Sequence, residues 1–282
     1  MRIADRLQAM AMHATARWTV RYGEELRFAG SELPDPEVVR VDTRHGPVPV
    51  HVYGSGTDGG TAAHVHLHGG AWLMRFPQMD DWWCRYLAAT TGAVVHNVDF
   101  RTGPYVAYPV AQEQAHDVAS WVAHRFGRTS VGGFSSGGGM AAAVALMARD
   151  RGSFTPALQV LGIPALDMAS EVPAAAGMIS PSLRGLVRRV YFPDVARRRE
   201  PYASPLLAPD LTGLPPALVL TAGRDTLRPD GVRYAQRLRE AGVDVWHHDT
   251  PGVDHYFLTE DPVRARDTMA QVADRVRSAL AG

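Results

Sequence analysis

From residue 37 onward, short apolar segments alternate with longer segments of helical spacing, and this alternation constrains the fold more than any single motif. Repeated strand-then-helix order is typical of a mainly parallel sheet with helices on both faces. The first two expected strands are joined by a short turn at 43–46, which predicts an antiparallel start. The expected strands are Val38–Asp42, Val48–Tyr53, Ala63–Leu67, Ala93–Val98, Ser130–Gly133, Ala157–Leu161, Ala217–Ala222 and Asp244–His248. The expected helices are Gln78–Thr90, Ala111–Arg125, Ser136–Asp150, Arg228–Ala241 and Pro262–Leu280.

Two segments lie outside this alternation. Residues 1–30 carry apolar positions at helical spacing and end at a proline-containing break at 31–36. Residues 168–200 interrupt a strand-to-strand connection with prolines and a helix-like run at 183–191. The apolar positions in the first segment are Ile3, Leu7, Met10, Ala14 and Trp18. Ligands of open α/β sheets bind beyond the carboxyl ends of the strands, so both segments are predicted to form a lid; the alternative is that they only cover apolar sheet surface. The predicted organisation is a cap segment at 1–36 and a core at 37–282 with a cap insertion at about 168–200.

Composition excludes several classes of protein. The 282 residues are 46% hydrophobic, enough for one large α/β domain, and 29 basic residues balance 29 acidic ones, which argues against a nucleic-acid or anionic-membrane partner. Cys84 is the single cysteine, so no intrachain disulfide forms, and we expect a buried structural thiol there. No apolar run reaches the length of a membrane span and no signal-peptide core is evident, which predicts a cytoplasmic protein.

The sequence Gly133-Phe134-Ser135-Ser136-Gly137 places a serine between a strand-like run and an alanine-rich helical run. A serine on a tight strand-to-helix turn can hold its hydroxyl in open space, and glycines on both sides allow the chain to turn without Cβ clashes. Ser135 is therefore the candidate nucleophile.

A serine hydroxyl needs a general base, and that base needs a carboxylate on its other ring nitrogen. His255 follows the last expected strand, and Asp225 ends the segment that begins with strand Ala217–Ala222, so base and acid follow the serine in the order required. Asp230 competes as the acid, but its position near a helix start favours an N-cap. Asp254 is adjacent to the base and is expected to point elsewhere.

A glycine-rich loop, His68 to Trp72, follows an apolar strand and can turn backbone N–H groups toward an oxyanion. We expect the oxyanion hole from Gly69, Gly70, Ala71 and Ser136, with Gly69 allowing close approach and the other three donating. Two consecutive glycines alone would indicate an ordinary turn; next to a candidate triad they indicate a donor loop.

Three histidines alternate along one expected strand: His64, His66 and His68. They would share one face of the sheet, which is compatible with a metal site, but no nearby carboxylate or cysteine completes a ligand set. We expect no metal and no cofactor.

Together these segments resemble the hormone-sensitive-lipase-like family of α/β-hydrolase esterases over about residues 40–280. His68–Trp72 is similar to its His-Gly-Gly-Gly motif, and the segment from Val98 to Pro104 is similar to its Val-Asp-Tyr-Arg-Leu-Ala-Pro segment. The resemblance implies an eight-stranded α/β-hydrolase core, a helical cap that includes the N-terminus, and hydrolysis of short acyl esters.

The sequence departs from the family at three positions. Phe134 stands where the family usually has Asp or Thr, Ser136 where it has Ala, and Ala71 replaces the third loop glycine. We expect the substrate pocket to include Trp72, Phe134 and Tyr256.

The predicted function is a serine carboxylic ester hydrolase that acts on short-chain, mostly neutral acyl esters through an acyl-enzyme. One alternative is a deacetylase or amidase of a specific acylated metabolite, and another is a catalytically silent binding protein on the same fold. The expected partner is a small acyl ester, without nucleic acid or a membrane span. A homodimer is compatible with the sequence, which does not specify the oligomeric state.

Overall fold

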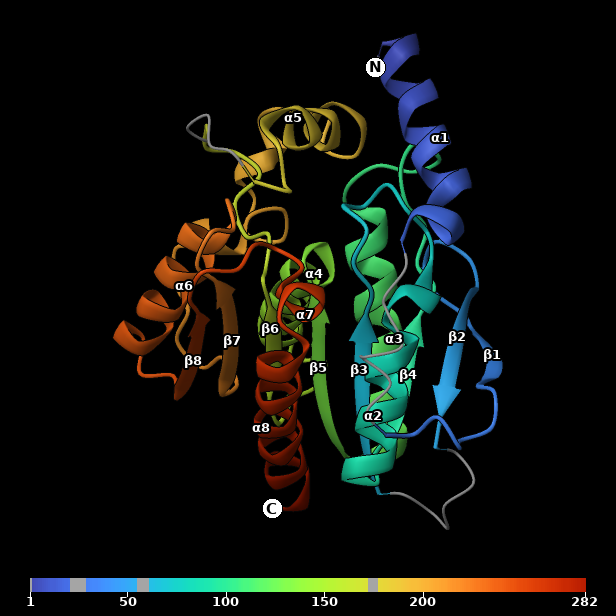
Figure 1. The fold of residues 1–282 in the computed structure, drawn as a ribbon, viewed down its shortest axis with the longest axis vertical. Helices are drawn as coiled ribbons and strands as arrows, with labels where there is room; N and C mark the ends of the chain where they lie inside the picture. The colour runs from blue at the N-terminus through green and yellow to red at the C-terminus, as the bar shows by residue number, and fades with distance from the viewer. Residues whose placement is uncertain (1, 21–28, 55–60, 172–176) are drawn as a thin grey trace.

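The computed structural model describes residues 2–20, 29–54, 61–171 and 177–282. Its strands are β1 (Glu37–Val41), β2 (Val48–Tyr53), β3 (Ala62–Leu67), β4 (Val94–Val98), β5 (Arg128–Phe134), β6 (Gln159–Gly162), β7 (Ala217–Ala222) and β8 (Val245–Thr250). They form one eight-stranded sheet in the order β1-β2-β4-β3-β5-β6-β7-β8 (Figure 1). β2 is antiparallel to both β1 and β4, and every other pair is parallel. The expected antiparallel start and parallel remainder are confirmed.

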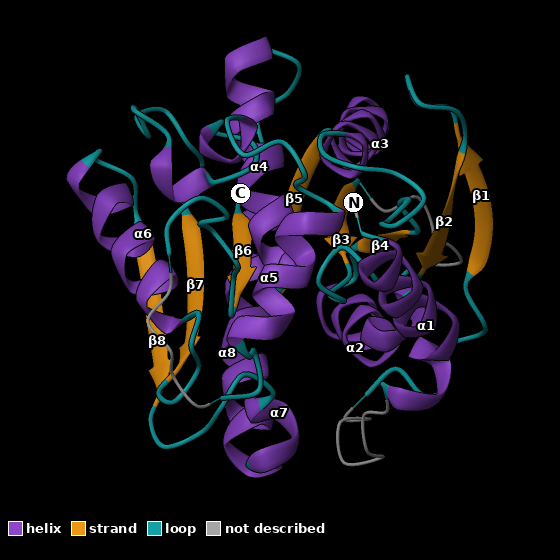
Figure 2. Cartoon of the chain, turned by 90° about the horizontal axis from the view of Figure 1, so that it is seen from above, coloured by secondary structure: helices purple, strands orange, loops and turns teal. Residues whose placement is uncertain are grey.

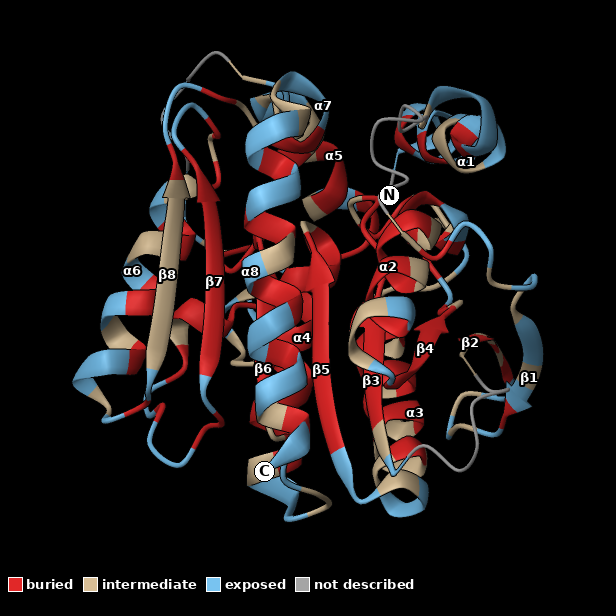
Figure 3. Cartoon of the chain, turned by 60° about the horizontal axis from the view of Figure 1, so that its bottom comes forward, coloured by how far each residue is buried: buried red, intermediate tan, exposed pale blue. Residues whose placement is uncertain are grey.

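Helices cover both faces of the sheet. One layer contains α2 (Asp81–Thr91) and α8 (Pro262–Ala281); the other contains α3 (Val110–Phe126), α4 (Ser136–Arg151) and α6 (Arg228–Glu240). Figure 3 shows α8 in front of buried strands with an exposed stripe along its outer side. α4 is buried along nearly its whole length, as its mostly small and apolar residues allow. Among the described residues, no helix combines the length and hydropathy that crossing a membrane requires.

Most expected elements differ from the observed ones by one or two residues at their ends, and three of the differences are instructive. β6 begins at Gln159 rather than Ala157, although the Ala157 N–H already donates to the Thr129 carbonyl at 2.8 Å. β8 continues to Thr250 because its parallel pairing with β7 extends through polar residues that carry no apolar pattern. The helix expected at 78–90 is divided into a 3₁₀ turn, η2 (Pro77–Asp80), and α2.

The N-terminal segment forms α1 (Ile3–Thr19), and the insertion forms α5 (Pro181–Val190) followed by the short turns η3 (Arg197–Arg199) and η4 (Pro205–Leu207). α1 and α5 lie beyond the carboxyl ends of the parallel strands (Figure 1), with α5 over the middle of the sheet and α1 toward its β2 side (Figure 2). Part of the insertion, including Pro173, lies outside the described residues.

The apolar positions whose spacing indicated a helix in this segment face solvent. The exposed fractions are 81% for Ile3, 60% for Leu7 and 54% for Trp18. The side that packs is instead formed by small residues, Ala9 and Ala16, which are nearly fully buried. Apolar spacing therefore identified the helix, whereas the buried apolar residues of α1 are small ones.

An ion pair ties α1 to α5. The carboxylate of Asp5 accepts two hydrogen bonds from the Arg189 guanidinium, each 2.9 Å long. Arg189 is the largest cause that holds the pKa of Asp5 below its usual value. This parallel two-point contact joins the first turn of α1 to the last turn of α5.

We predict opposite outcomes for two substitutions in α1. Leu7→Ser removes an exposed side chain, so the free energy of unfolding should change by no more than about 0.5 kcal/mol. Ala9→Leu inserts volume into a closed contact and should destabilise by about 1–3 kcal/mol. Urea denaturation of both variants checks this. A larger loss for Leu7→Ser than for Ala9→Leu would mean that α1 packs through its apolar stripe.

Candidate active site

Ser135 lies on the turn between β5 and α4 with backbone angles φ 56° and ψ −118°, a conformation that non-glycine residues rarely adopt. Two bonds hold the turn: the Ser135 N–H donates to the Gly162 carbonyl at 2.8 Å, and its carbonyl accepts from the Ala165 N–H at 3.1 Å. The expected strand–serine–helix context is therefore present, and the hydroxyl projects from the carboxyl edge of the sheet.

The glycines on either side of the serine allow the turn to approach β3. A Cβ atom added at Gly137 would lie 1.8 Å from the Leu67 carbonyl oxygen, and one added at Gly133 would lie 2.3 Å from the same atom. Both separations are far below van der Waals contact, so only glycine fits at these two positions.

The structure brings the three expected reactive side chains into one hydrogen-bonded chain. The Ser135 hydroxyl lies 2.9 Å from Nε2 of His255, in the loop between β8 and α7 (Phe257–Glu260). Nδ1 of His255 lies 2.7 Å from Oδ2 of Asp225, which follows β7, and both side chains are almost completely buried. The other Asp225 oxygen accepts the Leu227 N–H at 2.9 Å, which holds the carboxylate in place. Such an arrangement can move a proton from the hydroxyl to the imidazole while the carboxylate stabilises the resulting charge.

The two competing carboxylates make other contacts. Asp254 accepts the backbone N–H groups of His255 and Met178, so it joins the histidine loop to the insertion. Asp230 does not cap α6, because the residue at the N-cap is Leu227. Asp230 instead lies buried with one oxygen 3.8 Å from the Arg184 guanidinium of α5. Neither carboxylate reaches the imidazole of His255.

The loop after β3 lies beside the serine with backbone N–H groups available. Within the described part of the chain, the N–H groups of Gly70 and Ala71 donate no hydrogen bond to the protein. Gly70 has φ 107°, Ala71 has φ 56° and Trp72 has φ 54°, so the loop holds three consecutive residues in conformations with positive φ. Ser136 is the first residue of α4, where a backbone N–H has no partner within the helix.

Gly69 differs from its neighbours because its N–H donates to Oδ2 of Asp80 at 3.2 Å. Gly69 therefore does not donate to an oxyanion; its lack of a side chain leaves room next to Ser135, whose Cβ lies 3.8 Å from where a Gly69 Cβ would stand.

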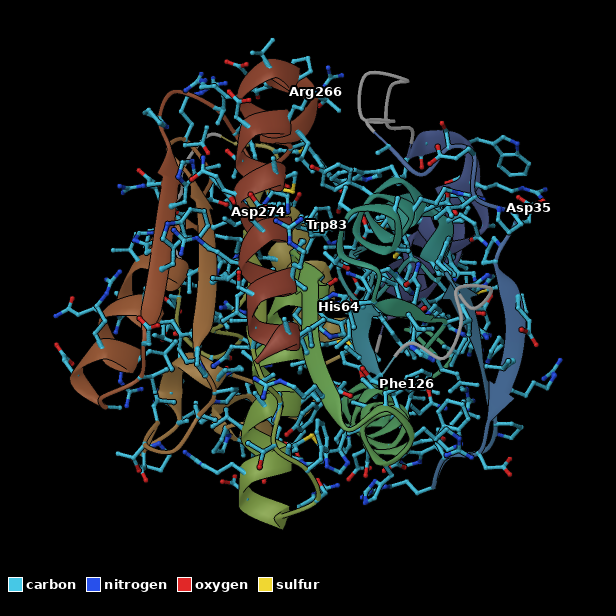
Figure 4. All side chains as sticks on the ribbon, turned by 90° about the horizontal axis from the view of Figure 1, so that it is seen from below. Asp35, His64, Trp83, Phe126, Arg266 and Asp274 are labelled. Carbon is cyan, nitrogen blue, oxygen red and sulfur yellow. The ribbon has the colours of Figure 1, made fainter. Side chains whose placement is uncertain are left out.

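The histidines of β3 and its loop are occupied by protein contacts. Burial lowers the pKa of His68 to about 4, so its ring is neutral near pH 7, and its Nδ1–H donates to the Gly69 carbonyl at 2.7 Å. His64, which lies beside β5 in Figure 4, is 2.8 Å from the Ser130 hydroxyl, and His66 is 2.9 Å from Asp80. In the described ranges no three His, Cys, Asp or Glu side chains are arranged to hold a metal ion.

A family model described as the alpha/beta hydrolase fold matches residues 64–259, which include the serine, acid and base positions and the glycine loop. The chain belongs to the α/β-hydrolase family.

Its relatives and structural neighbours include several esterases. Esterase LipI of Mycobacterium tuberculosis is 32% identical over 234 residues, which cover 77% of this chain and 73% of that protein. The arylesterase of Saccharolobus solfataricus is 29% identical, over 75% of this chain and 73% of its own. A solved esterase structure from Pyrobaculum calidifontis has a TM-score of 0.83 at 32% identity and covers 98% of this chain and 92% of its own. The resemblance to hormone-sensitive-lipase-like esterases is confirmed, and this α/β-hydrolase is a serine hydrolase of the carboxylesterase type.

An apolar pocket opens beside Ser135 in this α/β-hydrolase. The cavity itself is small, with a volume of about 40 Å³. Its walls come from the glycine loop, the start of α4, the segment after β6, and the insertion; they include Trp72, Ala165, Met168, Ile179, Leu183 and Val187. Trp72, expected in the pocket, does line it.

Two other expected pocket residues do not line it. Phe134 is the last residue of β5 and packs into the opposite layer, with ring centroids 6.0 Å from Trp82 and 5.9 Å from Trp83. Trp83 lies in the layer between α2 and α8 (Figure 4). Tyr256 is half-buried and packs edge-on against His255 at 5.4 Å, outside the pocket wall. Phe134 is adjacent to Ser135 in the sequence, but its ring lies on the opposite face of the sheet from the pocket.

Sequence reasoning missed Asp80 and Arg184. Asp80 stands in a segment that is expected to be helical, next to a second acidic residue, Asp81, and no signal in the sequence distinguishes the two. Arg184 lies on α5, is 9% exposed, and forms part of the pocket wall, while its guanidinium faces Asp230 rather than the cavity.

Asp230 should make stability depend on pH. Burial raises its pKa to about 6 from 3.8, so the folded protein binds a proton that the unfolded chain has released between these values. The stabilisation is complete below about pH 4 and is lost as the pH rises through 6. Relative to Asp230→Asn, wild type should lose up to about 3 kcal/mol between pH 4 and 7.5. Urea denaturation of both proteins across this range measures the difference, and a constant difference would contradict the assignment.

Proposed function

We propose that this protein hydrolyses short-chain, mostly neutral carboxylic esters, with Ser135 as nucleophile, His255 as general base and acid, and Asp225 as the group that orients the imidazole. The observation that carries the proposal is the continuous chain from the serine hydroxyl through both ring nitrogens to a buried carboxylate. Its support lies in geometry, since each group has the partner that its role requires.

In the first half-reaction, Oγ of Ser135 attacks the ester carbonyl carbon while Nε2 of His255 accepts the hydroxyl proton. The tetrahedral intermediate collapses when its bond to the alcohol oxygen breaks, and the imidazolium returns the proton to that oxygen. In the second half-reaction, His255 deprotonates a water molecule that attacks the acyl-enzyme. The acid leaves, and the proton returns to Ser135.

The oxyanion of each intermediate needs donors fixed before it forms. The free N–H groups of Gly70, Ala71 and Ser136 meet that need, since two belong to the loop after β3 and one begins the helix that follows the nucleophile. The same helix start adds a favourable dipole for negative charge.

The pocket wall favours a small, uncharged acyl group. Its surface is almost entirely apolar, and the two arginines in it are engaged with the protein: Arg184 with Asp230, and Arg188 with the Ser170 carbonyl. A charged acyl substituent would therefore lose its hydration without gaining a partner.

We propose further that residues 1–36 and about 168–200 act as a cap over the core at 37–282. The support is that Leu183 and Val187 of α5 form pocket wall above the nucleophile, while Asp5 of α1 is bound to α5.

Replacing Ser135 by Ala tests the proposal. The wild-type protein should hydrolyse p-nitrophenyl acetate or butyrate, and Ser135→Ala should lower kcat/KM by at least about 10⁴-fold, because among the described residues no other hydroxyl hydrogen-bonds to Nε2 of His255. Ser278→Ala, on the outer part of α8, is the matched control and should leave the rate unchanged.

A fluorophosphonate probe supplies a second readout. It should label wild type at Ser135 and should not label Ser135→Ala. Retained esterase activity in a folded Ser135→Ala variant, shown by an unchanged circular dichroism spectrum, would contradict the proposal. Matched ester and amide substrates measured on wild type determine which bond it prefers.

A further inference from the structure

A second buried histidine–carboxylate pair lies directly behind the glycine loop. Oδ2 of Asp80 accepts two hydrogen bonds, one from Nε2–H of His66 at 2.9 Å and one from the Gly69 N–H at 3.2 Å. The side chains of His66 and Asp80 are 0% and 1% exposed. A carboxylate so deeply buried is costly unless it is paired, and here the pairing reaches the loop that carries the expected oxyanion donors.

The two consecutive peptide units on either side of Gly69 are each held by a buried side chain. Asp80 holds the N–H of the unit between His68 and Gly69, and the His68 ring holds the carbonyl of the next unit at 2.7 Å. A trans peptide is planar, so the N–H of Gly70 points away from that bound carbonyl. The direction of the Gly70 N–H therefore depends on both contacts.

The turn η2 also supports the loop by packing. Cβ atoms added at Gly69 and Gly70 would lie 3.4 Å from the Met79 sulfur and 3.3 Å from its methyl carbon. Asp80, the next residue, has φ −111° and ψ 15°, which interrupts the helix and directs its side chain toward β3. The same short turn thus supplies both the apolar surface beneath the loop and the acceptor that fixes it.

We propose that His66 and Asp80 form a positioning unit for the oxyanion hole: Asp80 fixes the glycine loop through Gly69, and His66 fixes Asp80. The inference rests on the proposed esterase function. Neither residue touches the substrate or the reacting atoms.

The contribution of the pair is geometric rather than electrostatic. A carboxylate behind the hole opposes negative charge on the substrate oxygen, so its charge alone would slow the reaction. The hydrogen bond from His66 offsets part of the Asp80 charge. Nδ1 of His66 has no hydrogen-bond partner among the described residues, so Asp80 is the one hydrogen-bond partner of this ring in that part of the chain.

Two substitutions at Asp80 test the proposal. Asp80→Ala removes the acceptor and should lower kcat for p-nitrophenyl acetate by about 10- to 100-fold while KM changes less than about threefold, because donors are misplaced mainly in the transition state. Asp80→Asn keeps an oxygen for the Gly69 N–H and should recover most of the lost kcat. It also provides a folded comparison if Asp80→Ala is unstable.

A tetrahedral mimic separates positioning from a general structural effect. A trifluoromethyl ketone forms an oxyanion on Ser135, so its affinity should fall in Asp80→Ala by the same factor as kcat/KM. Asp81→Ala is the matched control. Its carboxylate binds Arg85 and the Tyr53 hydroxyl instead of the loop, and the variant should keep both kcat and inhibitor affinity.

The outcomes distinguish this inference from the proposed function. Unchanged kcat in folded Asp80→Ala, a loss confined to KM, or an Asp80→Asn variant no faster than Asp80→Ala would overturn the positioning role while leaving the esterase proposal intact. An active Ser135→Ala variant would overturn the esterase proposal itself, whatever the results at Asp80.

Discussion

The close approach of β5 and α4 to the end of β3 determines where the groups at this edge of the sheet lie. It is possible only because Gly133 and Gly137 present no side chain to the Leu67 carbonyl oxygen. Leu67 ends β3, and the glycine loop begins at the next residue. This backbone contact therefore sets the distance between the serine turn and the backbone N–H groups of the loop, independently of the side chains at the site. Hydroxyl and donors share one location because two pieces of backbone are in van der Waals contact.

Two buried imidazole–carboxylate pairs flank that location, and they differ in the third group that each pair contacts. His255 contacts Asp225 through one nitrogen and Ser135 through the other, so a proton can pass along it. His66 contacts Asp80 through one nitrogen, and that carboxylate continues to a backbone N–H rather than to a hydroxyl. The same interaction is thus suited to proton transfer in one place and to holding backbone in the other, and the third partner makes the difference.

The order of strands and helices could be predicted from the sequence because each element has its own periodic pattern. The serine, acid and base could be predicted together because each follows a strand, and parallel strands end at one edge of a sheet. Asp80 was not accessible in this way, since its role depends on a 3₁₀ turn that interrupts an apparently helical segment. The inner face of α1 was not accessible either. Hydrophobic periodicity reports which residues can be buried, whereas the apolar residues of α1 that are buried are the small ones, Ala9 and Ala16.

Because Phe134 is buried on the far face of the sheet, the packing beneath Ser135 and the wall of the pocket are formed by different residues. The Phe134 ring packs against Trp82 and Trp83, where a substitution that changes side-chain volume would disturb the core. Much of the pocket's roof comes instead from α5, through residues such as Leu183 and Val187. Substitutions of those α5 residues would change the shape of the pocket while leaving the packing beneath Ser135 unchanged.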